Sequence, residues 1–343
     1  MEMTQQEFAA LRRLHLALFA ERCFAHLNPG TPYIHNWHLD LIADRLERVA
    51  RGEIKRLIIN VPPRSMKSIT ASVAFPAWVL GHAPNKSLIC VSYSQELSDK
   101  HAEDTRTIMQ SSWYQALFPT RLSSKRPSLS FLKTFQGGGR RATSVGGTLT
   151  GLGADIILID DPLKPGDARG AARKSANDWL DNTLLSRLNN KKEGAIVIIM
   201  QRLHLDDTVG HVLQHGGWDV VTLPAIAIED ERFSFQNWVG MQKHARKPGD
   251  VLQPEREPLE VLEALRKQME SGVVLFPHEA SWLDVYIAEM TVFPNVRNDD
   301  QVDSTSQALG WMALPQQKIG MLVYCQQEME KLRRCDADSF SFQ

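Results

Sequence analysis

Four short apolar runs are spaced along the first 200 residues of the chain. None of them alternates apolar with polar positions, and they cover residues 57–60, 87–92, 156–159 and 195–200. Unalternated runs rich in Ile and Val are typical of strands buried on both faces of a parallel sheet. Helical spacing of apolar residues occurs before and between them, over 4–27, 36–51, 67–80, 95–111 and 170–189. This alternation predicts an α/β fold, a doubly wound parallel sheet whose ligands bind at the carboxyl ends of its strands.

The pattern changes after residue 227. Residues 228–270 are polar with few apolar runs, which indicates a linker or small subdomain with short elements. Residues 271–343 are mostly helical by spacing. A length of 343 residues fits about two domains. We therefore expect a first domain over 1–227 and a separate last region over 271–343.

Composition narrows the class of protein. Apolar residues make up 43% and charged residues 23%, which is ordinary for a globular chain. The formal net charge of −1 gives no indication of nucleic-acid binding, so any basic surface must be local. The four cysteines lie far apart, as in a protein of a reducing compartment. No apolar run reaches the ~18 residues of a membrane span, and the amphipathic N-terminus lacks the features of a signal peptide. We expect an intracellular protein without a membrane span.

The stretch RLIINVPPRSMKS, residues 56–68, has the form of a phosphate-binding loop between a strand and a helix. Val61 and Met66 occupy the two positions where such loops carry glycine. Lys67 is placed to reach the β- and γ-phosphates and Ser68 to bind Mg²⁺. Arg64 adds a second cation near the γ-phosphate. The alternative is a solvated helix start without a ligand.

A second motif, GADIILIDDP, ends a buried strand with Asp160 and Asp161. One carboxylate at such a strand end can hold Mg²⁺ through water, and its neighbour can orient the attacking water. A polar turn would have the same residues. The long interval between Lys67 and Asp160 leaves room for further strands, which favours a helicase-like or motor-like topology. Together the two motifs predict a nucleoside triphosphatase.

A third motif, IVIIMQRLHLDD, ends a buried strand with Gln201 and Arg202. A polar side chain at the end of the strand beside Asp160 can sense the γ-phosphate and pass its loss to a moving segment. A polar strand cap is the alternative.

Five segments in order resemble the large subunit of tailed-phage terminase, the motor that packages phage DNA. They are the three motifs above, CVSYSQELSDKHAEDTR and FPNVRNDDQVDSTSQAL. The resemblance covers about 30–270 and 273–325. It implies a P-loop NTPase of the additional-strand (ASCE) type, followed by a ribonuclease H-like nuclease. It also implies ATP and Mg²⁺ as cofactors and several copies acting together in the host cytoplasm. The implied partners are double-stranded DNA, a small terminase subunit and the portal protein.

The resemblance also assigns roles to residues of this chain. The phosphate loop comprises Arg64, Ser65, Met66, Lys67 and Ser68, with Mg²⁺ held by Ser68 and Asp160. Asp161 stands where the family has a catalytic glutamate, so the attacking water must lie closer or hydrolysis is slow. Gln201 is the coupling residue. Tyr33, Trp37 and His38 are candidates to contact adenine, with ordinary packing as the alternative.

The nuclease part of the resemblance is incomplete. Asp299, Asp300 and Asp303 form an acidic cluster on one helix face that could bind metal, or could serve only as helix-start residues. The strands and first acidic motif expected upstream are missing near residues 269–272, which indicates an internal deletion. The residues after 270 are also few for an independent core. We expect a truncated nuclease remnant with little or no activity.

Three functions remain open. The first is an ATP-hydrolysing packaging motor whose nuclease is lost. The second is a helicase-like ATPase that depends on nucleic acid. The third is a non-catalytic prophage remnant that only binds nucleotide or DNA.

Overall fold

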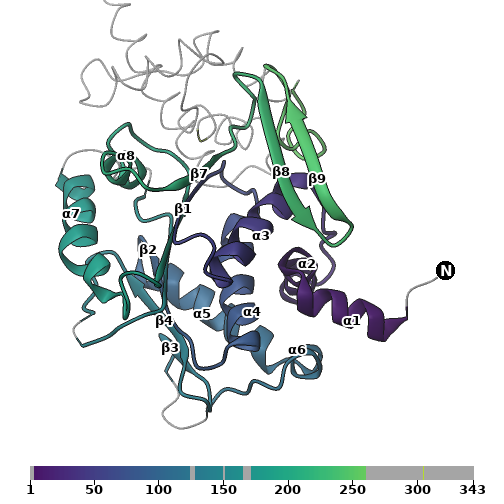
Figure 1. Ribbon diagram of the computed structural model, residues 1–343, viewed down its shortest axis with the longest axis vertical. Coiled ribbons are helices and arrows are strands. Elements are labelled where there is room, and N and C mark those ends of the chain that lie inside the picture. The colour runs from purple at the N-terminus through teal and green to yellow at the C-terminus, as the bar shows by residue number, and fades with distance from the viewer. Residues whose placement is uncertain (1–3, 124–127, 150, 165–170, 260–303, 305–343) are drawn as a thin grey trace, which may run out of the picture. The chain divides into compact units, whose positions relative to one another are not determined.

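The computed structural model describes residues 4–123, 128–149, 151–164, 171–259 and 304 (Figure 1). Their centre is a seven-stranded sheet in the order β3-β4-β2-β5-β6-β1-β7. All neighbours pair in parallel except β3 with β4. The strands are β1 Arg56–Asn60, β2 Ser87–Ser92, β3 Phe131–Lys133, β4 Gly139–Ser144, β5 Ile156–Asp160, β6 Ala195–Met200 and β7 Asp219–Thr222.

The four strands predicted from apolar runs are confirmed as β1, β2, β5 and β6. Residues of β5 and β6 are buried throughout, as a central parallel strand requires. Strand β6 lies between β1 and β5, with Ile58 opposite Ile198 and Leu158 opposite Val197. The strand that carries the lysine motif is therefore separated from the strand that carries the twin acids. This is the additional-strand order that the sequence predicted.

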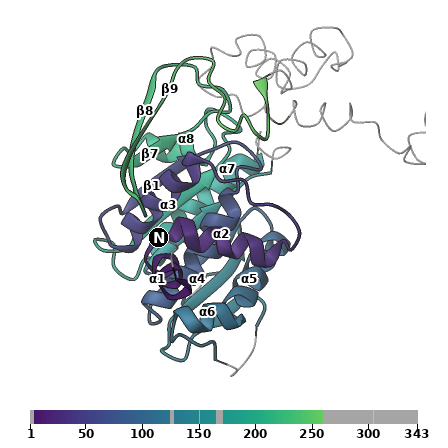
Figure 2. The ribbon, with the colours of Figure 1, turned by 90° about the vertical axis from the view of Figure 1, so that its right-hand side faces the viewer.

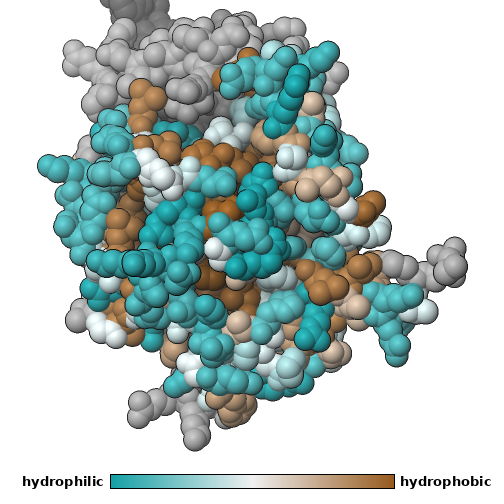
Figure 3. Space-filling view, viewed as in Figure 1, coloured by the Kyte–Doolittle hydropathy of each residue, from teal (hydrophilic) through white to brown (hydrophobic). Residues whose placement is uncertain are grey.

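Helices cover both faces of the sheet. One face packs against α2 to α6, and the other packs against α7, α8 and the turns after α7 (Figure 1). Successive residues of β1, β2, β5 and β6 alternate between the two cores; Ile58 faces one and Leu57 and Ile59 face the other. Over the face seen in Figure 3, hydrophilic and hydrophobic residues are interspersed.

The helical elements agree broadly with the predicted ranges. None of those described is long and apolar enough to cross a membrane. They are α1 Gln5–Leu14, α2 Leu16–Leu27, α3 Trp37–Ala50, the π-helix η1 Ile69–Ala74, α4 Phe75–His82, α5 Gln95–Gln110, α6 Ser112–Leu117, α7 Ala171–Trp179, the π-helix η3 Leu180–Leu184, the 3₁₀ turn η4 Leu185–Arg187 and α8 Thr208–Leu213.

A two-stranded antiparallel hairpin follows the main sheet, with β8 Glu231–Asn237 and β9 Gly240–Arg246 (Figure 2). It packs on α3, where the Trp37 ring stacks on His244 with centroids 4.0 Å apart. The hairpin lies in the 228–270 region, for which the sequence predicts short elements. The predicted nuclease remnant, with Asp299, Asp300 and Asp303, lies outside the described residues.

Candidate functional site

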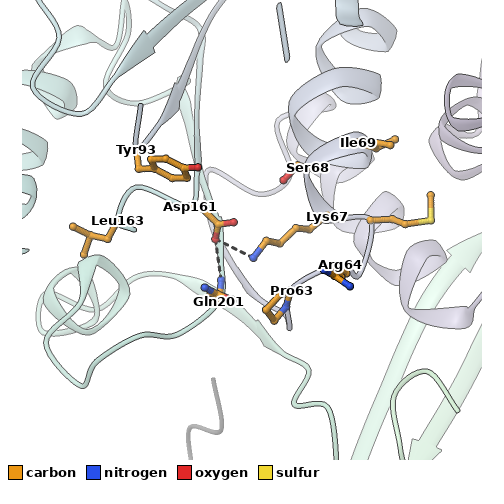
Figure 4. Close-up of a pocket in the computed structure, with 10 residues that line it drawn as sticks. Pro63, Arg64, Lys67, Ser68, Ile69, Tyr93, Asp161, Leu163 and Gln201 are labelled. Carbon is orange, nitrogen blue, oxygen red and sulfur yellow. Dashed lines mark hydrogen bonds and ion pairs between the residues drawn. The ribbon is translucent and has the colours of Figure 1, made fainter. Parts of the chain in front are cut away.

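A cavity of about 310 Å³ opens at the carboxyl ends of β1, β2, β5 and β6 (Figure 4). Parallel α/β sheets bind ligands at this edge. Four separate loops contribute to it, so distant parts of the chain meet there. The lining residues are Pro63, Arg64, Met66, Lys67, Ser68, Ile69, Tyr93, Asp161, Leu163 and Gln201.

An ion pair joins the two main motifs inside this cavity. Lys67 Nζ donates to Asp161 Oδ1 at 2.9 Å (Figure 4). The backbone N–H of Gln201 donates to the same oxygen at 3.1 Å. Lys67 is almost fully buried, whereas a quarter of the Asp161 side chain is exposed. All three motifs therefore meet at one carboxylate.

The loop after β1 holds two residues other than glycine in a left-handed backbone conformation. Arg64 and Met66 have φ angles of 58° and 62°, in the left-handed region that favours glycine. For a residue with a side chain, such a conformation costs roughly 1–3 kcal/mol and persists where the surroundings hold it. Ser65 helps to hold it, since its hydroxyl donates to the Pro62 carbonyl at 2.7 Å. His38 Nε2 lies 3.2 Å from the Ser65 carbonyl oxygen on the other side.

Asp160 lies beneath the cavity and does not line it. Its side chain is fully buried, and Oδ2 accepts a hydrogen bond from the Ser72 hydroxyl at 2.6 Å. Burial raises the pKa of this carboxyl, while Ser72, Lys67 and Ser68 act in the opposite direction. The neighbouring His101 ring is also buried, which lowers its pKa to about 4 and keeps it neutral.

The oxygen atoms here suit a magnesium ion. Among the described residues, Asp160 Oδ1 has no hydrogen-bond partner, and the Ser68 hydroxyl interacts with the same carboxyl group. Mg²⁺ prefers one or two carboxylates or hydroxyls and keeps several waters. The part of the chain that the structure describes contains no group of three His, Cys, Asp or Glu able to hold a metal. An ion held by one carboxylate and one hydroxyl, with phosphate oxygens and water as its other ligands, would agree with both the unpartnered Oδ1 and the absence of a three-residue group among the described residues.

The adjacent side chains of Gln201 and Arg202, at the end of β6, have different surroundings. Gln201 lines the cavity, and its amide oxygen has no partner among the described residues. Arg202 turns away, and its Nε donates to both oxygens of Asp207 at 3.1 and 2.9 Å. Asp207 also caps α8 by accepting from the Gly210 N–H at 2.9 Å. The predicted coupling residue therefore reaches the cavity, while its neighbour ties the strand end to α8.

Other predicted residues lie outside the cavity lining. Tyr33 packs edge-on against Phe24, with ring centroids 5.6 Å apart. His38 is buried, with its ring nitrogens 2.7 Å from Asn36 Oδ1 and 3.2 Å from the Ser65 carbonyl. The Ser65 hydroxyl donates to the Pro62 carbonyl within the loop, and the Trp37 ring contacts Phe233 of the hairpin. For Tyr33, Trp37 and His38, these contacts favour the packing interpretation over contact with adenine.

The sequence analysis missed several residues of the site. Tyr93 directly follows β2, and the rule that pointed to Asp160 could have found it. Ser72 gave no signal, because its importance arises only from tertiary contacts with Arg140 and Asp160. Arg140 belongs to a basic stretch of the sequence that suggests phosphate contacts at a surface, and the structure buries it instead.

No protein-family model and no curated protein matches the chain. Among solved structures, it is similar to the large terminase of bacteriophage HK97, with 14% identity and a TM-score of 0.44 over 88% of this chain and 52% of that one. It is also similar to the ATPase domain of the large terminase of Thermus phage P74-26, with 14% identity and a TM-score of 0.34 over 52% of this chain and 68% of that one. The chain thus spans about half the length of the HK97 protein. Both are phage large terminases, the family that the sequence motifs resemble.

Proposed function

We propose that the chain is an ATP-hydrolysing motor subunit of a phage DNA-packaging terminase. The observation that carries the proposal is the contact of Lys67 Nζ with Asp161 Oδ1 at 2.9 Å, in a cavity shared with Ser68 and Gln201. A lysine, a hydroxyl and a carboxylate at the ends of separate buried strands are the parts that phosphoryl transfer uses. An unrelated helix start and an unrelated polar turn would not be expected to meet.

In this mechanism, binding of the triphosphate breaks the ion pair between Lys67 and Asp161. The Lys67 ammonium then binds the β- and γ-phosphates, and exposed Arg64 provides a second cation at the mouth of the cavity. Ser68 and Asp160 would hold Mg²⁺, which neutralises negative charge that develops on the phosphates. These roles agree with their positions at the start of the helix and beneath the cavity.

Asp161, once released from Lys67, is the residue that orients the attacking water and accepts its proton. Its φ of 43° projects the carboxylate from the end of β5 into the cavity. The Gln201 N–H holds the same carboxylate, so that movement at the end of β6 changes its position. Gln201 can thereby report loss of the γ-phosphate to Arg202, Asp207 and α8.

The packaging role rests on the ordered resemblance of the five sequence segments. The resemblance implies that the chain acts in the host cytoplasm. Its implied partners are double-stranded DNA, a small terminase subunit, the portal protein and further copies of the chain. A helicase-like ATPase would use the same cavity geometry. Co-purification with portal protein or small subunit supports the motor, whereas stimulation by nucleic acid without either partner supports the alternative.

The test is Mg²⁺-dependent ATP hydrolysis by the full chain beside its Lys67→Ala variant. We expect hydrolysis by the unchanged chain and a loss of at least about a hundredfold in the variant, because the phosphates lose their main counter-charge. Equal rates would refute the site. ATP binding without turnover by the unchanged chain would leave the third hypothesis, a non-catalytic remnant.

A further inference from the structure

A completely buried arginine lies in β4. By volume, Arg140 is the largest of the fully buried side chains in the described part of the chain. Its Nη2 donates to the Ser72 carbonyl oxygen at 3.2 Å. Its Nε and Nη1 find no oxygen acceptor among the described residues, and the nearby Cys90 thiol is only a weak acceptor. Because a guanidinium stays charged in proteins, such burial needs a negative charge close by.

Asp160 is the carboxylate that Ser72 links to this guanidinium. Arg140 stands opposite Leu88 of β2, and Asp160 stands opposite Ser92 of the same strand. Leu88 and Ser92 are four residues apart, so the Arg140 and Asp160 side chains project from the same face of the sheet. Burial raises the pKa of the Asp160 carboxyl, and the positive charges of Lys67 and Arg140 act in the opposite direction.

Ser72 of η1 connects the two buried charges. Its carbonyl oxygen accepts from Arg140 Nη2, and its hydroxyl donates to Asp160 Oδ2 at 2.6 Å. His101 is also near, with Nδ1 3.9 Å from Asp160 Oδ2, but this nitrogen makes no hydrogen bond within the described residues. Ser72, itself held by Arg140, therefore binds one carboxylate oxygen, and Oδ1 has no hydrogen-bond donor among the described residues.

We infer that Arg140 is a positioning residue for the magnesium site, a buried positive charge that holds Asp160 through Ser72. This inference rests on the proposed function and adds a residue that does not touch nucleotide or metal. Without Arg140, Asp160 keeps the hydrogen bond from Ser72 and the positive charge of Lys67, but the Ser72 carbonyl loses the donor that holds it.

A purely structural role for Arg140 makes a different prediction. If the side chain only fills space, Arg140→Met, which keeps an unbranched chain, should preserve metal binding better than Arg140→Lys. If its charge positions Asp160, the order reverses, because lysine retains the charge that methionine lacks.

The experiment titrates Mg²⁺ into the full chain bound to a fluorescent ATP analogue. We expect the half-saturating Mg²⁺ concentration to rise about tenfold or more in Arg140→Met, as the loss of one charge-assisted interaction predicts. Arg140→Lys should recover most of this loss. Affinity for the analogue in EDTA should change by less than about threefold in both variants, since the lysine loop is untouched.

The matched control is Arg121→Gln. Arg121 donates to the backbone carbonyls of Gln115, Phe118 and Thr120 near α6 and does not line the cavity. Its loss should lower stability without changing the Mg²⁺ dependence. Ser72→Ala is a second test that alters little volume, and it decides the question if Arg140→Met does not fold. We expect it to weaken Mg²⁺ binding by about threefold or more.

Unchanged Mg²⁺ dependence in Arg140→Met, or in Ser72→Ala where the first variant does not fold, would overturn the inference. So would equal loss in the Met and Lys variants. Failure of the unchanged chain to bind the analogue at all would instead refute the proposed function, so the two failures can be told apart.

Discussion

His38 Nε2 lies 3.2 Å from the carbonyl oxygen of Ser65, which joins α3 directly to the loop after β1. On the other side of the ring, Nδ1 lies 2.7 Å from Asn36 Oδ1. Trp37, the residue that precedes His38, stacks on His244 of the hairpin. One end of α3 is therefore held between the hairpin and the loop that carries Lys67.

The burial of His38 predicts how stability depends on pH. Burial lowers its pKa from 6.5 to about 4, so between these values the unfolded chain binds more protons than the folded one. Stability from this residue is complete above pH 6.5 and declines as the pH falls toward 4. At about 1.4 kcal/mol per pKa unit, the decline from pH 7.5 to 5 is roughly 2 kcal/mol.

Urea unfolding at pH 7.5 and pH 5 measures this decline in the unchanged chain and in His38→Gln. The variant should be less stable at pH 7.5 but lose less on acidification. His101, whose pKa burial also lowers to about 4, contributes in both proteins and cancels from the difference. Identical declines in the two proteins would contradict the prediction.

Met66→Gly tests the strained loop. Met66 has a φ of 62°, so glycine relieves about 1 kcal/mol of backbone strain while loosening the unfolded chain by a similar amount. We expect unchanged stability within about 1 kcal/mol and retained nucleotide affinity.

Val61, at the other glycine position, is buried and has no positive φ. Val61→Gly should therefore lose roughly 2–3 kcal/mol in chemical denaturation. Similar losses at both positions would show that strain at Met66 is absent.

The sequence was most informative where one physical cause dominates. Buried parallel strands require continuous apolar runs, so β1, β2, β5 and β6 could be predicted, and so could the cavity at their ends. Strand β4, with sequence GRRATS, could not, since its buried Arg140 is tolerated only through contacts with distant residues. Edge strand β7 was missed because DVVT is mostly exposed and has only two apolar residues. The resemblance makes His38 a candidate to contact adenine, but its ring nitrogens contact Asn36 and Ser65, an arrangement that forms only in the folded chain.

The acidic cluster near the C-terminus predicts an outcome that can be checked without the ATPase site. From the sequence, we expect Asp299, Asp300 and Asp303 to lack the upstream acidic strand that a two-metal nuclease needs. Incubation of the full chain with supercoiled plasmid and Mg²⁺ or Mn²⁺ should produce no nicked or linear DNA. Cutting that disappears in Asp300→Ala would show that the cluster forms a working nuclease.

The final prediction concerns the side chain that faces Lys67. Asp161→Asn keeps the shape of the residue but removes the negative charge that accepts from Lys67 Nζ and the Gln201 N–H. ATP no longer competes with a carboxylate for Lys67, so affinity should stay the same or rise by up to about tenfold. Loss of the base should lower kcat by at least about a hundredfold. Asp161→Glu is the matched variant, since it keeps the charge and adds one methylene of reach, and it should hydrolyse ATP at least as fast as the unchanged chain. Single-turnover hydrolysis with a parallel binding titration separates the two effects. If Asp161→Asn loses binding and rate together, Asp161 is needed to build the cavity, and the base must be sought in another residue.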